Sequence, residues 1–127
     1  MPAYLDFCET FRRRTRFRPA LPTEVYFIRK DDHALLSFSP KEDIFTLDLV
    51  DSIPRVPEDE AYWRWMNRDF NDFAARHGAR PLLNQTKELS RAVVHRALGN
   101  DWASFATLRQ QADPDGRFLN DFFKALL

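Results

Sequence analysis

Three histidines and a single cysteine are the side chains best suited to bind a metal or act as a nucleophile in this sequence of 127 residues. Zinc sites in proteins bring such ligands together at short, regular spacings. His33, His77 and His95 are far apart in the chain, and none of them lies within one helical turn of another histidine or of Cys8. The sequence also contains no GxSxG, HExxH or CxxC motif and no glycine-rich phosphate loop. We therefore predict no metal site in this chain.

Two clusters of charged residues have the composition of other binding sites. Asp113 and Asp115 precede Gly116 as in part of a calcium loop, but the remaining ligands of such a loop are missing, so we predict a plain turn. The run RRRTRFR at 12–18 has the composition of a nucleic-acid contact. Because 19 basic residues are balanced by 19 acidic residues over the whole chain, we interpret this run as a solvated helix end.

The order of helical and extended patterns predicts an α+β fold. The spacing of apolar residues predicts helices over 2–16, 58–77, 90–98, from 101 onward and over 121–127. A segment rich in β-branched and aromatic residues predicts a strand over 24–29, and 34–38 is expected to be the returning strand. Alternation of apolar and polar residues predicts a third strand over 44–50. Because short turns join these strands, we expect an antiparallel sheet of about three or more strands, with helices packed on one face and short helices at the C-terminus.

Composition indicates one folded domain over residues 1–127. Hydrophobic residues make up 44% of the chain, which is enough for a core and argues against intrinsic disorder. The single cysteine excludes an internal disulfide and suits a reducing compartment. The first residues have no continuous apolar segment like that of a signal peptide, and no segment approaches the ~20 apolar residues that span a bilayer. We therefore expect a cytoplasmic protein without a transmembrane segment.

The most specific pattern lies in the second half of the chain. GARPLLNQTK at 78–87 follows the longest predicted helix, and a second motif closes the sequence. The matching residues are Arg80 and Pro81, followed by Trp102, Phe105, Arg109, Asp113, Pro114, Gly116, Phe118, Leu119, Asn120, Phe123, Leu126 and Leu127. This ordered set resembles the closing segment of FAD-linked sugar-lactone, alditol and related oxidases of the vanillyl-alcohol-oxidase superfamily. EVYFIRKDDHALLSFSP at 24–40 resembles a strand pair of the same family, so the resemblance covers most of the chain from 24 to 127.

The resemblance implies a part of a flavoenzyme. Proteins of this superfamily have a two-part FAD-binding domain and a cap domain, whose antiparallel sheet and helices cover the flavin ring and supply the substrate pocket. This sequence has no counterpart of the FAD-binding domain. The chain would therefore be the cap and C-terminal segment of an FAD-dependent oxidoreductase that oxidises an alcohol or lactone-type C–OH by hydride transfer, and it would be inactive alone. Its partners would be an FAD-binding domain or chain and a small-molecule substrate, and an uncovered apolar face would favour self-association into a homo-oligomer.

The same resemblance implies which residues line the pocket. Glu24 matches the acidic position of the family's Glu-x-Arg strand, and Tyr26 stands where the family has arginine. After the Arg-Pro pair the family continues His-Trp-Gly-Lys, whereas this chain has Leu-Leu-Asn-Gln. The candidates for the substrate or flavin pocket are Glu24, Tyr26, Asn84, Gln85 and Lys87. A cation near flavin N1 stabilises the charge that hydride transfer leaves there, so Gln85 in place of lysine should weaken this stabilisation unless Lys87 reaches the ring.

Two other functions are compatible with the residues. The chain length and the missing lysine would also suit a non-enzymatic interaction module that keeps the cap fold and has lost the flavin. A nucleic-acid-binding α+β domain rests on the arginine run alone. Flavin absorbance separates the first alternative from an oxidase, and a steep salt dependence of binding to DNA or RNA would support the second.

Overall fold

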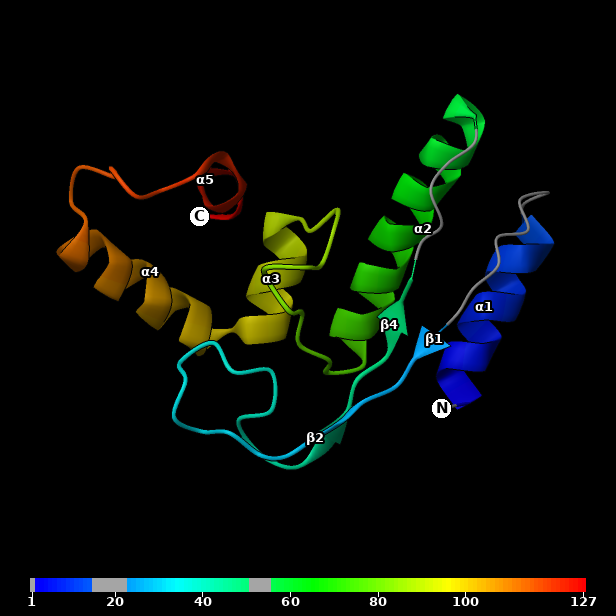
Figure 1. Ribbon diagram of the computed structural model, residues 1–127, viewed down its shortest axis with the longest axis horizontal. Helices are drawn as coiled ribbons and strands as arrows, with labels where there is room; N and C mark the ends of the chain where they lie inside the picture. The colour runs from blue at the N-terminus through cyan, green and yellow to red at the C-terminus, as the bar shows by residue number, and fades with distance from the viewer. Residues whose placement is uncertain (1, 15–22, 51–55) are drawn as a thin grey trace.

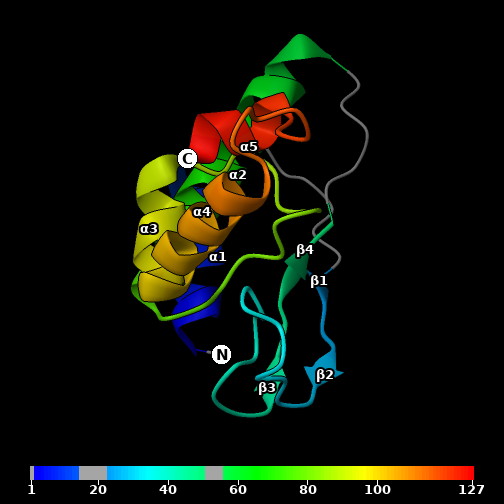
Figure 2. The ribbon, with the colours of Figure 1, turned by 90° about the vertical axis from the view of Figure 1, so that its left-hand side faces the viewer.

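The computed structural model describes residues 2–14, 23–50 and 56–127, which form helices and short antiparallel strands (Figure 1), and in Figure 2 the strands lie to one side of the helices. The helices are α1 (Pro2–Arg14), α2 (Pro57–Arg76), α3 (Arg91–Leu98), α4 (Asn100–Ala112) and α5 (Asp121–Leu126). The strands are β1 (Thr23–Glu24), β2 (Phe27–Ile28), β3 (Ile44–Phe45) and β4 (Asp48–Leu49). The α+β class expected from the sequence is confirmed.

The four short strands form one antiparallel ribbon. Glu24 of β1 pairs with Asp48 of β4, and Phe27 of β2 pairs with Phe45 of β3. The same register runs through both pairs, and between them the Thr46 amide donates a hydrogen bond of 2.9 Å to the Tyr26 carbonyl. The segments 23–28 and 44–49 therefore pair directly with each other, and this ribbon carries two of the five candidate pocket residues, Glu24 and Tyr26.

The strand expected over 34–38 does not form, and this prediction is corrected. The Ser37 amide donates to the Ala34 carbonyl at 3.0 Å, which makes a turn, and the Ser39 hydroxyl donates to the Arg29 carbonyl at 3.0 Å. Leu36 leaves the ribbon and packs against the helical core of α3, α4 and α5. The apolar residues that predicted a strand here are a local signal, and the packing of Leu36 against distant helices overrides it.

The C-terminal helices enclose the larger hydrophobic core. Its buried members are Val94 and Leu98 of α3, Trp102 of α4 and Leu126 of α5. Gly99 connects α3 to α4 with φ 53°, a conformation that glycine adopts at little steric cost. The turn expected at 113–116 is confirmed, because the Asp113 carboxylate accepts hydrogen bonds from the amides of Arg117 (2.8 Å) and Phe118 (3.0 Å). This turn brings α5 back over the core.

Helix α1 packs against α2 through a second, more aromatic core. Phe11 of α1 is buried with Trp63 and Met66 of α2. Further along the same interface, Phe7 of α1 stacks on Phe73 of α2 with ring centroids 5.0 Å apart. The predicted helix 2–16 ends at residue 14 in the described part of the chain, and 15–16 lie outside it, as do 16–18 of the arginine run. The three arginines at 12–14 are exposed, as expected for a solvated helix end.

The ribbon leaves aromatic side chains open to solvent. The Phe27 and Phe45 rings contact each other across the two strands in a tilted arrangement, with centroids 5.4 Å apart, and both are exposed. Exposed aromatic pairs of this kind favour contacts with another surface. Self-association of the chain stays a prediction. Among the described residues, no helix has the length and hydropathy required to cross a membrane.

Candidate functional site

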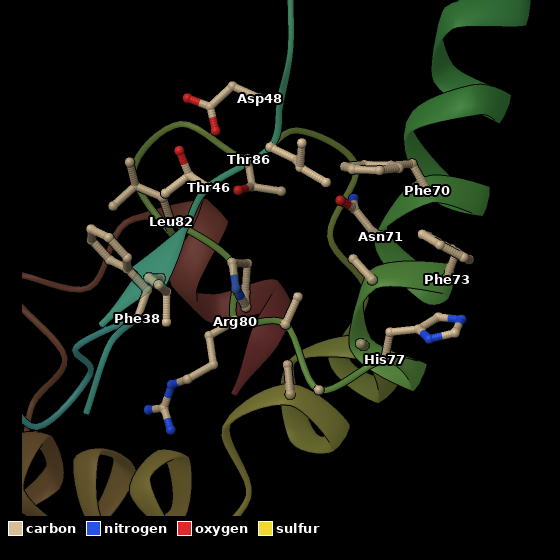
Figure 3. Close-up of a pocket in the computed structure, with 18 of the residues that line it drawn as sticks. Phe38, Thr46, Asp48, Phe70, Asn71, Phe73, His77, Arg80, Leu82 and Thr86 are labelled. Carbon is tan, nitrogen blue, oxygen red and sulfur yellow. The ribbon is translucent and has the colours of Figure 1, made fainter. Parts of the chain in front are cut away.

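A cavity of about 790 Å³ lies between the ribbon and the helices (Figure 3). One wall is the ribbon, a second wall is the C-terminal half of α2, and a third is the segment 78–89 that follows α2. The first and third walls come from the two regions that carry the family resemblance.

The ribbon wall presents hydrogen-bonding groups. Glu24 and Tyr26 on one segment, and Thr46 and Asp48 on the other, line the cavity. They alternate along their strands, and alternate residues of a strand share one face. The Tyr26 hydroxyl donates a short hydrogen bond to the Glu24 carboxylate, and the Tyr26 amide donates to the Thr46 hydroxyl at 3.2 Å. These contacts fix the Tyr26 backbone and phenol at the cavity.

The Glu24 carboxylate raises the pKa of Tyr26 above its ordinary value of 10.0, first by accepting its hydrogen bond and then by its negative charge, while Asp48 makes the smallest contribution. Because the folded pKa is raised, the stabilisation from this contact is complete below pH ~10 and is lost as the pH rises through the folded pKa.

We expect Glu24→Gln to move the Tyr26 titration back toward the ordinary pKa, whereas Asp48→Asn should move it much less. The measurement is phenolate absorbance against pH, with Tyr26→Phe to assign the Tyr26 component among the three tyrosines. Equal effects of the two carboxylate variants would contradict the assignment of the shift to Glu24.

The α2 wall is mostly apolar and contains one buried amide. Phe70, Phe73 and Ala74 line the cavity together with Asn71, whose side chain belongs to a residue only 7% exposed. The Asn71 amide nitrogen donates to the Lys87 carbonyl at 2.7 Å, which satisfies this polar group in the interior. Asn71 therefore joins the helix wall to the segment after it.

The third wall is a short turn that follows Arg80. The amides of Gln85 and Thr86 donate to the Leu82 carbonyl at 3.0 and 2.9 Å, and all three residues line the cavity. In Figure 3 the Arg80 guanidinium points away from Thr46 and Asn71. It is 12% exposed, and its Nη1 donates to Asp101 at 2.8 Å. Nε and Nη2 of Arg80 are buried and have no acceptor among the described residues.

The structure brings three of the five candidate residues to one cavity. Glu24 and Tyr26 line it from the ribbon, and Gln85 lines it from the loop. Asn84 and Lys87 are exposed and are absent from the lining, although Lys87 contributes its carbonyl to the contact with Asn71. The chemical roles of all five residues stay predictions.

Several lining residues were missed by sequence reasoning although the sequence carried a signal for them. Thr46 and Asp48 are the polar partners in an alternating strand, so they share the face opposite the apolar residues of that segment. Asn71 follows Phe70 in α2, and both residues line the cavity. A buried side-chain amide at this position requires a hydrogen-bond partner. Among the described residues, no group of three or more His, Cys, Asp or Glu side chains is arranged to hold a metal ion.

Comparisons with known proteins place the sequence of this chain in a family. The family model described as D-arabinono-1,4-lactone oxidase matches residues 1–126. The L-gulonolactone oxidase of Scyliorhinus torazame is 30% identical over 117 residues, which cover 84% of this chain and 23% of that protein. The chain thus spans about a quarter of the length of this relative. No solved structure matches the chain at a significant level.

Proposed function

We propose, since this chain belongs to the D-arabinono-1,4-lactone oxidase family, that it forms the substrate side of a flavin-dependent oxidoreductase that oxidises an alcohol or lactone-type C–OH. The observation that carries the proposal is the shared cavity of Tyr26 and Gln85. These residues lie in the two segments that resemble the family's pocket, 59 positions apart in the sequence, and they line the same space.

The cavity residues suit one end of FAD. Tyr26, Thr46 and Gln85 offer hydrogen bonds, and Phe70 and Phe73 offer an apolar surface, which together suit an uncharged flavin ring or a sugar-like substrate. The diphosphate needs a cradle of backbone amides, usually rich in glycine. The three glycines of this chain end helices or complete the turn at 116, so the described residues offer no such cradle. We infer that FAD is held mainly by sequence outside this chain.

When bound, the flavin would accept the hydride from the substrate carbon. The residues of this chain would accept the proton that leaves the substrate hydroxyl and pass it on. That hydroxyl can donate to the Tyr26 oxygen, while the phenol proton passes to the Glu24 carboxylate that it already contacts. Because the pKa of Tyr26 is raised, the phenol stays protonated near neutral pH, so it can pass on its own proton only as it takes up the one from the substrate.

The remaining partners follow from the same proposal. An FAD-binding domain or chain would complete the cavity, and the exposed aromatic pair of the ribbon is an apolar surface that such a partner could cover. A cytoplasmic location, as the single cysteine suggests, belongs to this proposal as well.

The test uses the complete polypeptide or complex that contains this chain. We expect a flavin absorbance spectrum that is bleached when an aldonolactone or alditol is added without oxygen. Tyr26→Phe should slow this reduction, because it removes the proton path to Glu24, and should leave the bound flavin in place. A complete protein that contains no flavin would favour the interaction-module alternative and overturn the proposal.

A further inference from the structure

Glu88 has an unusual backbone conformation for its residue type. Its φ is 55°, and among the described residues it is the one non-glycine with a positive φ. This left-handed conformation costs free energy for a residue with a Cβ atom. Such strain persists where surrounding contacts determine the conformation, and it is concentrated at sites where geometry matters. The contacts of Glu88 show what holds it.

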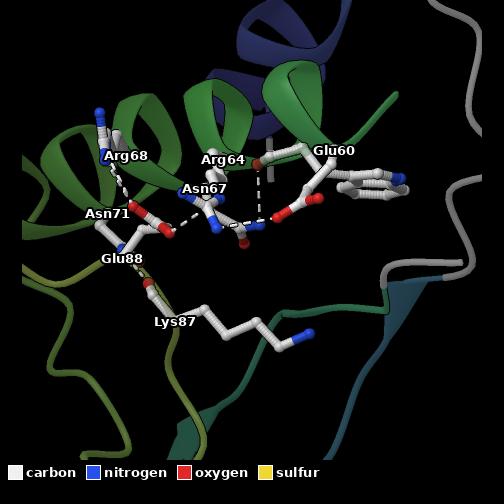
Figure 4. A network of polar contacts seen from close by, with 8 residues as sticks. Glu60, Arg64, Asn67, Arg68, Asn71, Lys87 and Glu88 are labelled. Atoms are coloured by element: carbon white, nitrogen blue, oxygen red, sulfur yellow. Dashed lines mark hydrogen bonds and ion pairs between the residues drawn. The ribbon is translucent and has the colours of Figure 1, made fainter. Parts of the chain in front are cut away.

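The Glu88 carboxylate is bound by arginines of α2 (Figure 4). Two nitrogens of Arg68, Nε and Nη2, lie 2.9 and 2.8 Å from Oε2 of Glu88. Nε of Arg64 lies 3.8 Å from the other carboxylate oxygen. The Glu88 side chain is 24% exposed, so this ion pair is less screened by solvent than a fully exposed pair.

The preceding residue is tied to the same helix. The Asn71 side chain donates to the Lys87 carbonyl at 2.7 Å, so consecutive residues of the chain are attached to α2 by Asn71 and Arg68. We call Arg68, Asn71 and Glu88 the clamp, and residues 81–87 the cavity loop. At the other end of the cavity loop, Arg80 is anchored to Asp101 of α4 at 2.8 Å.

We propose that Glu88 is a positioning residue, whose clamp holds the cavity loop so that Gln85 and Thr86 face the cavity. Within the loop, the bonds of Gln85 and Thr86 to the Leu82 carbonyl shape a turn, but they do not fix where that turn sits. The position of the turn is fixed by the anchors at the two ends of the cavity loop, which are Arg80 at one end and the clamp at the other. The strained Glu88 backbone lets the chain reverse between the clamp and the start of α3 at Arg91. The role in catalysis rests on the function proposed above, whereas the clamp can be tested without flavin.

Two variants of Glu88 separate the effect of the backbone strain from the effect of the ion pair. Glu88→Gly relieves the backbone strain and removes the ion pair, whereas Glu88→Ala removes the ion pair and keeps the strain. The matched control is Glu60→Ala, because Glu60 pairs with the same Arg64 at 2.8 Å but forms this ion pair within α2, one turn from Arg64. We expect the amides of Gln85 and Thr86 to exchange with solvent about tenfold faster in both Glu88 variants and at an unchanged rate in Glu60→Ala.

Thermal unfolding supplies the second readout. Glu88→Gly should unfold at a temperature no lower than that of Glu88→Ala, and yet its loop should exchange equally fast. A residue that serves stability alone would show loop exchange that follows the unfolding temperature, and that result would overturn the proposal. Unchanged exchange in Glu88→Gly, or equal acceleration in Glu60→Ala, would overturn it too.

In the complete flavoprotein, Glu88→Gly should lower kcat/KM while the flavin spectrum stays the same. Faster loop exchange with an unchanged kcat/KM would show that the clamp does not position a catalytic wall. A wild-type protein without flavin would instead count against the proposed function, and the exchange experiment would still decide the clamp.

Discussion

Replacing Trp102 with alanine is expected to lower the free energy of unfolding by about 3–5 kcal/mol. The side chain is 1% exposed and lies in the core formed by α3, α4 and α5. Its ring stacks on Phe105 at 5.3 Å and on Phe123 at 6.4 Å. Because three helices meet on this indole, its removal leaves a hole that no single neighbour can fill. A loss of this size is a large part of the stability of a typical domain.

Urea unfolding followed by circular dichroism measures this change. The control is Phe118→Ala, another aromatic truncation in the same C-terminal region, at a side chain that is 89% exposed. It should change the free energy of unfolding by no more than about 0.5 kcal/mol. A loss below about 1 kcal/mol in Trp102→Ala would mean that the three helices are not held together by this core.

Filling the cavity is the second large expected effect. Ala74 of α2 lines the cavity beside Phe70 and Phe73. A tryptophan at this position would occupy space that the proposed function assigns to a substrate or flavin ring. We expect Ala74→Trp to lower kcat/KM of the complete flavoprotein at least about tenfold, because a displaced ligand loses more than ~1.4 kcal/mol of contacts. The measurement is the rate of lactone oxidation against substrate concentration.

Ala92→Trp is the matched control for the cavity experiment. Ala92 lies on α3, is exposed and does not line the cavity, so the same side chain is introduced into a helix with the same change in helix propensity. Circular dichroism should show both variants folded. If Ala74→Trp retained full activity, the cavity would not be the substrate pocket and the function proposed from it would fail.

The sequence was sufficient for the helices, for the turn at 113–116 and for the family. Helix spacing is a local property: each apolar stripe needs only its own segment to be recognised, and α2, α3 and α5 lie within one or two residues of the ranges predicted for them. The family motifs are equally local, since they consist of residue types at set intervals. The segments that carry Tyr26 and Gln85 can for that reason be identified from the sequence alone.

Long-range packing determined the features of the fold that local sequence patterns did not predict. Residues 34–38 are mostly apolar and were expected to form a strand, but Leu36 packs against the core of α3 to α5 and the segment turns. Trp63 of α2 packs against Phe11 of α1, and which face of α2 is buried depends on where its partner helix lies. The clamp at Glu88 joins residues 20 positions apart, and the cavity wall joins residues farther apart still. No local sequence pattern predicts these long-range contacts, because they depend on the free energy of surfaces that come together only when the whole chain folds.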